Sequence, residues 1–299
     1  MTATLPALVV SVGKNAAWVV LDAEDEPRIA DLKRISAGAK REMPVPGDRV
    51  GVRLGTQERA LIECIQDRSF TLLRRSAEGR EKIMAANVDT IVTVTSLADP
   101  PPRLLTLDQV LAFSELEASS ALVVFTKPDL VDEPVKERLR LLYEGLGYAT
   151  VVVNPKAGWN MDELRTALRA RHGLLTGVSG VGKSSIFRAL GGQAHVGEVS
   201  RRGLGRQTTS TARLFRTSDG FLIDSPGVAE FGLGKIAPEE LVHGFREMPQ
   251  VAAACRFTDC THLREPGCAV MAAVEDGRIA PSRYASYRQI LGVDPQTPL

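Results

Sequence analysis

The first part of the chain consists of short apolar runs separated by turns. ALVVSV is followed by GKN and AAWVVL, and PVPGDRVGVRL and ALIECI come later, before about residue 68. None of these runs has helical periodicity, and several short strands at this spacing predict a small barrel or sandwich. Residues 1–68 are therefore expected to form an N-terminal domain, and a five-stranded oligonucleotide-binding barrel (OB-fold) fits their length.

The hydrophobic pattern changes after Arg75. DTIVTVTS, ALVVFT, ATVVVN, GLLTG and GFLIDS are continuous apolar runs that each open into a polar or glycine-rich loop. Helical segments such as LTLDQVLAFSELEA lie between several of them. Fully apolar strands that alternate with helices are typical of a parallel sheet covered on both faces. Residues 69–235 thus form a predicted α/β domain whose ligand loops lie at the carboxyl ends of the strands.

The last part of the chain has a helical pattern. PEELVHGFREM and SRYASYRQIL flank a cysteine-rich segment, so residues 236–299 are expected to form a small helical C-terminal domain. Tyr284, Tyr287 and Leu291 have i, i+3, i+7 spacing, which indicates core packing along one helix face. The predicted fold is therefore multidomain, with an OB-fold barrel, a central α/β domain and a small helical domain.

The charges nearly cancel over the whole chain, with 37 Lys and Arg against 36 Asp and Glu. Two segments are nonetheless basic. Residues 199–218 contain five arginines and no acid, and residues 28–53 contain seven basic residues against three acidic ones: Arg28, Lys33, Arg34, Lys40, Arg41, Arg49 and Arg53. Such patches are either phosphate-facing surfaces or solvated faces, and composition does not separate the two.

The N-terminal MTATLPALVVSVG has neither the basic start nor the long apolar core of a secretory signal, and no apolar run is long enough to cross a bilayer. A cytoplasmic location is expected. Thiols stay reduced there, so clustered cysteines favour metal binding over disulfides. Cys64 stands apart in ALIECI and is predicted to be a buried small hydrophobe.

The stretch GVSGVGKS, Gly177 to Ser184, matches the phosphate-binding pattern G-x-x-x-x-G-K-[ST]. It lies between an apolar run and a helical segment, as the pattern requires. The backbone N–H groups surround phosphates, Lys183 supplies a charge for the β/γ oxygens, and the Ser184 hydroxyl is a Mg²⁺ ligand. The predicted nucleotide-binding residues of this loop are Gly177, Val178, Ser179, Gly180, Val181, Gly182, Lys183, Ser184 and Ser185. A plain glycine-rich turn is the alternative.

The motif DSPG, Asp224 to Gly227, ends the apolar run FLI. Asp224 is predicted to hold Mg²⁺ with Ser184, directly or through water. The N–H of Gly227 is predicted to reach the γ-phosphate, because glycine has no side chain to obstruct that movement. Alone the motif is a common turn and weak evidence for a nucleotide site. It becomes strong evidence in a chain that also has the phosphate loop.

The motif TKPD, comprising Thr126, Lys127, Pro128 and Asp129, ends the run ALVVF. The Asp129 carboxylate can accept hydrogen bonds from guanine N1–H and N2–H₂, whereas adenine offers neither donor. Pro and Asp are also ordinary turn residues, so the motif alone is weak. Together with the phosphate loop it predicts GTP as the nucleotide, and an ATPase is the disfavoured alternative.

TKPD precedes the phosphate loop, whereas an ordinary GTPase has the reverse order. The ends of a doubly wound domain often lie close together at the surface, so joining them and reopening the chain elsewhere leaves every loop at the same sheet edge. The motif order therefore indicates circular permutation of one GTP site. It also connects the segment after DSPG directly to the C-terminal domain.

The segment Cys255-x₄-Cys260-x-His262-x₅-Cys268 supplies three thiolates and one imidazole. Four such ligands close a tetrahedron with no open position, which favours structural over catalytic zinc. His172, His195 and His243 have no comparable neighbours and are predicted to be surface or packing residues. A domain this small is not expected to fold without its ion.

The sequence resembles one family from end to end, the circularly permuted small-ribosomal-subunit-dependent GTPase A proteins of bacteria. The motifs that carry the resemblance are TKPD, GVSGVGKS, GRQTTST, DSPGVAEFGL and CRFTDCTHLREPGCAV, in that order. The resemblance implies a Mg²⁺-dependent GTP hydrolase that binds the small ribosomal subunit late in its maturation. It further implies that the OB-fold barrel and the zinc domain bind ribosomal RNA. The protein is expected to be a monomer.

Three positions depart from the family pattern. Thr126 stands where the family usually has Asn, and its hydroxyl can keep part of the loop-bracing role. NPKAG replaces the usual S-A-x-x-G loop, so Pro155 removes an N–H if it occupies the position that meets guanine O6. Gln207 in GRQTTST replaces the histidine suspected in catalysis.

The expected catalytic residues are Lys183, Gln207 and Thr209. Val228, directly after DSPG, cannot orient water, so intrinsic hydrolysis should be slow and depend on a partner. Gln207 either holds the attacking water or is a solvated loop residue. Thr209, in preference to Thr208, is expected to reach Mg²⁺. The functional alternative to an enzyme is a GTP-gated RNA-binding switch with negligible turnover.

Overall fold

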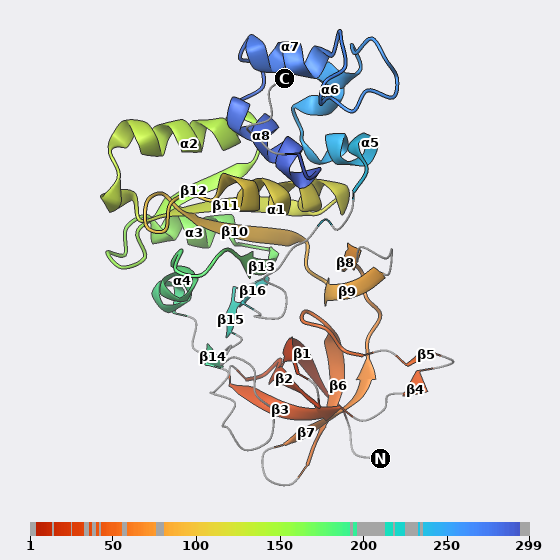
Figure 1. The fold of residues 1–299 in the computed structure, drawn as a ribbon. Coiled ribbons are helices and arrows are strands. Elements are labelled where there is room, and N and C mark those ends of the chain that lie inside the picture. The colour runs from red at the N-terminus through yellow and green to blue at the C-terminus, as the bar shows by residue number, and fades with distance from the viewer. Residues whose placement is uncertain are drawn as a thin grey trace.

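The computed structural model describes residues 4–13, 15–24, 26–32, 36–37, 40–41, 43–55, 59–75, 81–191, 194–195, 213–217, 219–224, 233 and 236–293. It contains a barrel, a seven-stranded sheet with helices on both faces, and a helical C-terminal part (Figure 1). This is the predicted multidomain fold class. Within the described residues, no helix has the length and hydropathy that a membrane span requires.

The N-terminal barrel is closed by five strands in the order β1-β2-β3-β7-β6. Only β3 and β7 pair in parallel; the other neighbours are antiparallel. The strands are β1 (Leu5–Val12), β2 (Ala16–Leu21), β3 (Pro27–Leu32), β6 (Arg49–Leu54) and β7 (Ala60–Ile65). A short pair, β4 (Ser36–Ala37) and β5 (Lys40–Arg41), lies outside the barrel sheet.

Strand β1 is apolar without alternation because both of its faces are covered. Ala7 and Val9 belong to the barrel core, whereas Leu8 and Val10 pack in the cluster that contains Leu72 and other residues of the central domain. Side chains alternate between the two faces of a strand, so one continuous apolar run can serve two cores. The barrel is thereby fixed to its neighbour through β1.

Cys64 corrects one sequence prediction, because its side chain is exposed. A register shift between Gly51 and Val52 brings Gly51 opposite Cys64 and Val52 opposite Ile62. Glu63 therefore has no residue opposite it on strand β6. The extra residue of such a bulge changes which side chains point inward. Ile62 is fully buried, and the thiol two residues later is not.

The described arginines of the basic segment in the barrel are paired with acids. Arg28 pairs with Glu24 at an N···O distance of 2.8 Å. Arg49 pairs with Asp22 at 2.5 Å, and Arg53 pairs with Glu63 at 2.6 Å. The side chains of Lys33, Arg34, Lys40 and Arg41 lie outside the described residues. In the second basic segment, Arg216 donates to the backbone oxygen of Leu21 at 3.1 Å and so helps attach the barrel.

A hairpin of β8 (Thr71–Arg75) and β9 (Glu81–Ala86) leads into the central sheet, whose order is β12-β11-β10-β13-β16-β15-β14. The strands β10 (Thr90–Ser96), β11 (Ser120–Thr126), β12 (Ala149–Val153), β13 (His172–Thr176) and β16 (Phe221–Asp224) are parallel. The edge strands β15 (Arg213–Arg216) and β14 (Ala194–His195) are antiparallel. The predicted parallel sheet thus carries an antiparallel edge.

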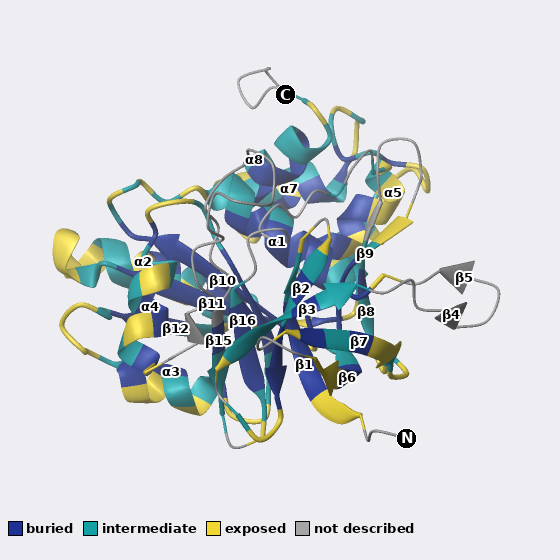
Figure 2. Cartoon of the chain, turned by 90° about the horizontal axis from the view of Figure 1, so that it is seen from below, coloured by how far each residue is buried: buried dark blue, intermediate teal, exposed yellow. Residues whose placement is uncertain are grey.

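Helices cover both faces of this sheet. Val123 and Phe125 face α1 (Leu104–Leu116) and α2 (Glu133–Gly145), whereas Leu122 and Val124 face α3 (Met161–Ala167) and α4 (Lys183–Leu190). Coverage on both sides explains why the strands read as continuous apolar runs. In Figure 2 these strands are coloured as buried.

The C-terminal part packs on the outer side of α1. It contains α5 (Pro238–Leu241), a 3₁₀ turn at Val242–Gly244, α6 (Met248–Ala252), α7 (Ala269–Glu275) and α8 (Pro281–Ile290). Tyr287 is fully buried and Tyr284 nearly so, which confirms their predicted core packing, and Leu291 packs against the same cluster. Figure 1 places this part and the barrel at opposite ends of the central domain. The boundaries at residues 68 and 235 stay predictions.

Candidate GTP site and metal centre

The motif loops meet at one edge of the central sheet. Strands β11, β13 and β16 are parallel to their neighbours and end at Thr126, Thr176 and Asp224. TKPD follows the first, the phosphate loop follows the second, and DSPG begins at the end of the third. Because β10 lies between β11 and β13, the loops predicted to bind the base and the phosphates are two strands apart. Their sequence order does not alter this placement.

Glycine is required in the phosphate loop by the backbone conformation. Gly177, Gly180 and Gly182 have φ values of 143°, 84° and 103°, where L side chains are strained. At Gly177 a Cβ atom would lie 2.4 Å from the backbone oxygen of Val94. Gly182 is the N-cap of α4, which therefore begins at Lys183 with its amide groups facing the loop.

Lys183 folds over the phosphate loop. Its Nζ donates to the backbone oxygens of Gly177 at 2.5 Å and Val178 at 3.0 Å. Burial lowers the pKa of Lys183, and the negative charge of Asp224 partly opposes this shift. Phosphate oxygens would offer the ammonium a stronger, charge-assisted partner than these carbonyls. Ser184 is exposed on the first turn of the same helix.

Thr126 joins the two loops. It is fully buried at the end of β11. Its Oγ1 lies 2.5 Å from the backbone oxygen of Val181 and 3.4 Å from that of Thr95, and its hydroxyl hydrogen can serve one of them at a time. This bond from TKPD into the phosphate loop agrees with the bracing that we expected the hydroxyl to retain.

The next residues of TKPD turn sharply toward the loop after β10. Lys127 has the left-handed φ of 58°, and its Nζ donates to the backbone oxygen of Asp99. Asp129 is exposed within a 3₁₀ turn, Pro128–Leu130. Its Oδ1 accepts a hydrogen bond from Asn154 Nδ2 at 2.8 Å. Asn154 begins NPKAG, so this loop also reaches the candidate base site.

The remaining predicted residues of the GTP site lie outside the described residues. They are Gln207, Thr209 with its alternative Thr208, and Gly227. Val228, expected not to orient water, lies outside them as well. The described part of the site therefore comprises the phosphate loop, TKPD, NPKAG and Asp224. Ser184 and Asp224 are hard oxygen donors on the two elements next to Lys183, and such donors fit Mg²⁺.

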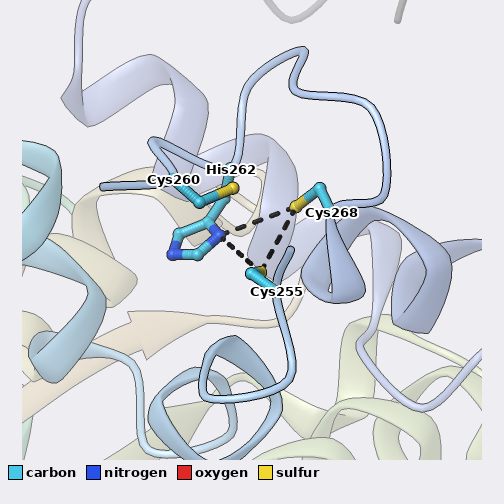
Figure 3. A group of neighbouring side chains, drawn as sticks. All are labelled: Cys255, Cys260, His262 and Cys268. Atoms are coloured by element: carbon cyan, nitrogen blue, oxygen red, sulfur yellow. Dashed lines mark hydrogen bonds between the residues drawn. The ribbon is translucent and has the colours of Figure 1, made fainter. Parts of the chain in front are cut away.

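The four predicted metal ligands converge in the C-terminal part (Figure 3). One candidate ligand atom from each of Cys255, Cys260, His262 and Cys268 lies within 4.8 Å of all the others. His262 Nδ1 is 3.5 Å from Cys255 Sγ and 3.6 Å from Cys268 Sγ, and these two sulfurs are 4.0 Å apart. Tetrahedral zinc, with Zn–S distances of ~2.3 Å, implies ligand separations of about 3.5–4 Å. The predicted four ligands fit zinc.

Backbone and carboxylate groups hold the cysteine loops in place. The N–H groups of Ala269 and Met271 point at Cys255 Sγ and Cys268 Sγ, at 3.3 and 3.5 Å. Glu265 accepts from the backbone N–H of Thr261, Leu263 and Arg264 at 3.1, 3.1 and 3.2 Å, and from the Thr261 hydroxyl. Burial would raise the pKa of Glu265, but these hydrogen bonds outweigh it and lower the pKa to about 2.

The other histidines behave as predicted where they are described. His172 stacks on Phe221 with ring centroids 4.7 Å apart, and His243 is exposed. The side chain of His195 lies outside the described residues. Neither described residue belongs to the metal cluster.

Sequence reasoning missed two polar groupings. Asn154 was considered only as part of a loop, although its side chain reaches Asp129. A buried set formed by Asp108, Tyr143, Glu247 and Arg283 connects α1 and α2 with the C-terminal part. The signal for the second was a charged residue within the apolar helix LTLDQVLAFSEL, which predicts a buried partner elsewhere.

Comparison with known proteins gives consistent similarities. A family model described as RsgA GTPase matches residues 65–234. The "small ribosomal subunit biogenesis GTPase RsgA" of Pseudomonas aeruginosa is 41% identical over 95% of this chain and 86% of its own length. The protein of the same description from Azotobacter vinelandii is 40% identical over 93% of this chain and 83% of its own.

Two solved structures are similar over nearly the whole chain. YjeQ from Thermotoga maritima has a TM-score of 0.69 and 30% identity, covering 96% of this chain and 97% of that chain. YloQ, described as a circularly permuted GTPase, has a TM-score of 0.65 and 25% identity, covering 97% and 95%.

Proposed function

Because the chain belongs to the RsgA GTPase family, a family of GTP-hydrolysing P-loop proteins, we propose that it hydrolyses GTP to GDP and phosphate in the late maturation of the small ribosomal subunit. Family membership and the circularly permuted fold agree with the order of motifs in the sequence. The small subunit is proposed to stimulate turnover. The proposed RNA-binding parts are the barrel and the zinc domain, which flank the GTPase domain (Figure 1).

The observation that carries the proposal is the bond from Thr126 to the backbone oxygen of Val181. It ties TKPD to the phosphate loop, so one ligand that has both a guanine base and a triphosphate fits them together. The base would lie at Asp129, and the phosphates at the start of α4 beside Lys183. A helix N-terminus with inward N–H groups favours such an anion.

The proposed roles of the residues follow from their chemistry. Lys183 exchanges its carbonyl partners for phosphate oxygens and holds the charge that develops during transfer. Ser184 and Asp224 would hold Mg²⁺, joined by Thr209; the ion, when bound, neutralises charge on the phosphates. Gly227 would donate its N–H to the γ-phosphate, and Gln207 would position water. Residues 177–185 and Thr126, Lys127, Pro128 and Asp129 would bind the nucleotide.

The proposed zinc ligands are Cys255, Cys260, His262 and Cys268, with the metal in a structural role. Bound zinc stabilises the thiolates and closes the loop between α6 and α7. The protein is proposed to act as a monomer in the cytoplasm. Size-exclusion chromatography with light scattering at several concentrations tests the first of these statements.

GTP turnover measured with purified small or large ribosomal subunits tests the main proposal. Stimulation by small subunits alone is expected, and Asp129→Asn should lose guanine preference because an amide presents a donor to a guanine donor. Nucleotide-dependent subunit binding without turnover would instead favour a GTP-gated RNA-binding switch. Gln207→Ala with unchanged stimulated turnover would remove the role proposed for Gln207.

A further inference from the structure

The Asn154 side chain is fixed from both sides. Its Nδ2 donates to Asp129 Oδ1 at 2.8 Å, while its Oδ1 accepts from the backbone N–H of Ala157 at 3.3 Å. The backbone N and O of Asn154 pair with Trp159 at 3.1 and 3.0 Å. These bonds close the NPKAG loop and distinguish the nitrogen end of the amide from its oxygen end.

The amide and the carboxylate together present an ordered row of hydrogen-bonding atoms. Asn154 Nδ2 is a donor, and the next two positions are the acceptor oxygens Oδ1 and Oδ2 of Asp129. A planar NH₂ group has two hydrogens, so one can serve Asp129 while the other serves a ligand. Asp129 is exposed and Asn154 is partly exposed, so a base can approach both.

The pairing edge of guanine has the opposite order, with the acceptor O6 followed by the donors N1–H and N2–H₂. We propose that Asn154 is a specificity-determining residue that donates to guanine O6, while Asp129 accepts from N1–H and N2–H₂. The row of donor, acceptor and acceptor is the same one that cytosine presents to guanine in a base pair. This inference rests on the proposed function, which places the base at Asp129.

Pro155 removes one backbone donor from this loop. Proline has no N–H, so the backbone of the residue that follows Asn154 cannot donate to O6. The Ala157 N–H is already directed at Asn154 Oδ1. Adenine, with an amino group in place of O6, would bring a donor against the Asn154 donor, and its N1 acceptor would face the Asp129 carboxylate. Both residues therefore select against adenine.

Binding of GDP, inosine diphosphate and 6-thio-GDP to full-length protein with its zinc tests the inference by isothermal titration calorimetry. 6-Thio-GDP keeps both donors and replaces O6 by a weaker acceptor, whereas inosine diphosphate keeps O6 and lacks only the N2 amine. The wild-type chain should bind GDP about tenfold more tightly than 6-thio-GDP, which corresponds to one hydrogen bond. Asn154→Ala should bring this ratio close to one.

The ratio between GDP and inosine diphosphate should stay unchanged in Asn154→Ala, because Asp129 reads the N2 amine. A variant that weakens all three nucleotides equally would show that Asn154 only orients Asp129, and this would overturn the inference. An unchanged ratio between GDP and 6-thio-GDP would do the same. Asp162→Ala is the matched control, since that side chain is 98% exposed and, among the described residues, its ion pair is with Arg165 in the same helix.

Failure of this inference is distinct from failure of the proposed function. If wild-type protein binds GDP and ADP equally, Asp129 does not read guanine and the function itself is wrong. If GDP is preferred over ADP but Asn154→Ala keeps the preference over 6-thio-GDP, only the role of Asn154 is lost. Equal melting temperatures and zinc contents of the variants ensure that folded proteins are compared.

Discussion

Arg283 Nη1 on α8 lies 2.6 Å from Asp108 Oδ1 on α1, and the two side chains are 1% and 0% exposed. The other guanidinium nitrogens donate to Glu247 at 2.7 and 3.1 Å, and Tyr143 on α2 donates to Asp108 at 2.9 Å. A charge in the interior is tolerated only when it is paired and hydrogen-bonded. The C-terminal part is thus attached to helix α1 of the central sheet by a fully enclosed ion pair.

Replacement of Arg283 by Met should destabilise the protein by about 3–5 kcal/mol, because it leaves buried carboxylates without their cation. Asp108→Asn should cost a similar amount, and the double variant should be less destabilised than the sum of the two. Urea denaturation followed by circular dichroism measures all three. Strict additivity would contradict a direct interaction between the two residues.

Gly244→Ala should loosen the same interface through steric overlap. A Cβ at Gly244 would lie 2.9 Å from Ala112 Cβ and 3.1 Å from Ala112 Cα, so α1 and the 3₁₀ turn would have to separate. Overpacking of this kind costs about 1–3 kcal/mol. In Gly145→Ala, the added methyl group meets nothing within 4 Å, and the substitution should be neutral or stabilising. A melting temperature for Gly244→Ala at or above wild type would refute the overlap.

Thr126→Val should reduce GTP affinity. The substitution preserves shape but removes the hydroxyl that braces Val181, and a buried hydrogen bond lost in this way costs about 1–3 kcal/mol. Affinity should fall by about tenfold, with a smaller effect from Thr126→Ser, which keeps the hydroxyl. Titration with a fluorescent GTP analogue measures both. Equal affinity of the Val variant and wild type would show that the brace does not organise the site.

Glu265→Ala should weaken zinc binding without removing a ligand. Glu265 accepts hydrogen bonds from backbone N–H groups on both sides of His262 and lies 3.7 Å from Cys260 Sγ. Its loss should therefore make the loop that carries these two predicted ligands less ordered. Such supporting residues typically change metal affinity by about 10–100-fold. Competition with a chromogenic zinc chelator measures the change. Glu275→Ala, an exposed carboxylate on α7, provides the control and should release zinc as wild type does.

The sequence names candidate site residues where these are consecutive along the chain. GVSGVGKS predicts phosphate binding and TKPD predicts guanine recognition, each from a few adjacent residues. The four predicted metal ligands likewise lie close together, from Cys255 to Cys268. Parallel strands then bring the motif loops to one edge. The pattern also anticipated the barrel and the buried face of Tyr284 and Tyr287.

Contacts that depend on tertiary register were not predictable in this way. Asp108 and Arg283 are 175 residues apart, and Asn154 and Asp129 are 25 apart, so neither pair forms a motif. Cys64 looked buried because the run ALIECI is apolar, but a single bulge changed the direction of its side chain. The local hydrophobic pattern shows which side chains gain free energy from burial. The tertiary packing decides which of them are buried in the fold.

The loop before helix α1 contacts the candidate nucleotide site, and the middle of the helix contacts the C-terminal part. In that loop the backbone oxygen of Asp99 accepts a hydrogen bond from Lys127. One turn into the helix Asp108 pairs with Arg283, and one turn further Ala112 lies close to Gly244. The helix thus lies between the candidate nucleotide site and the C-terminal part. If a partner binds the C-terminal part more tightly in the position of α1 that favours guanine binding, guanine nucleotide must in turn tighten the binding of that partner, by thermodynamic reciprocity.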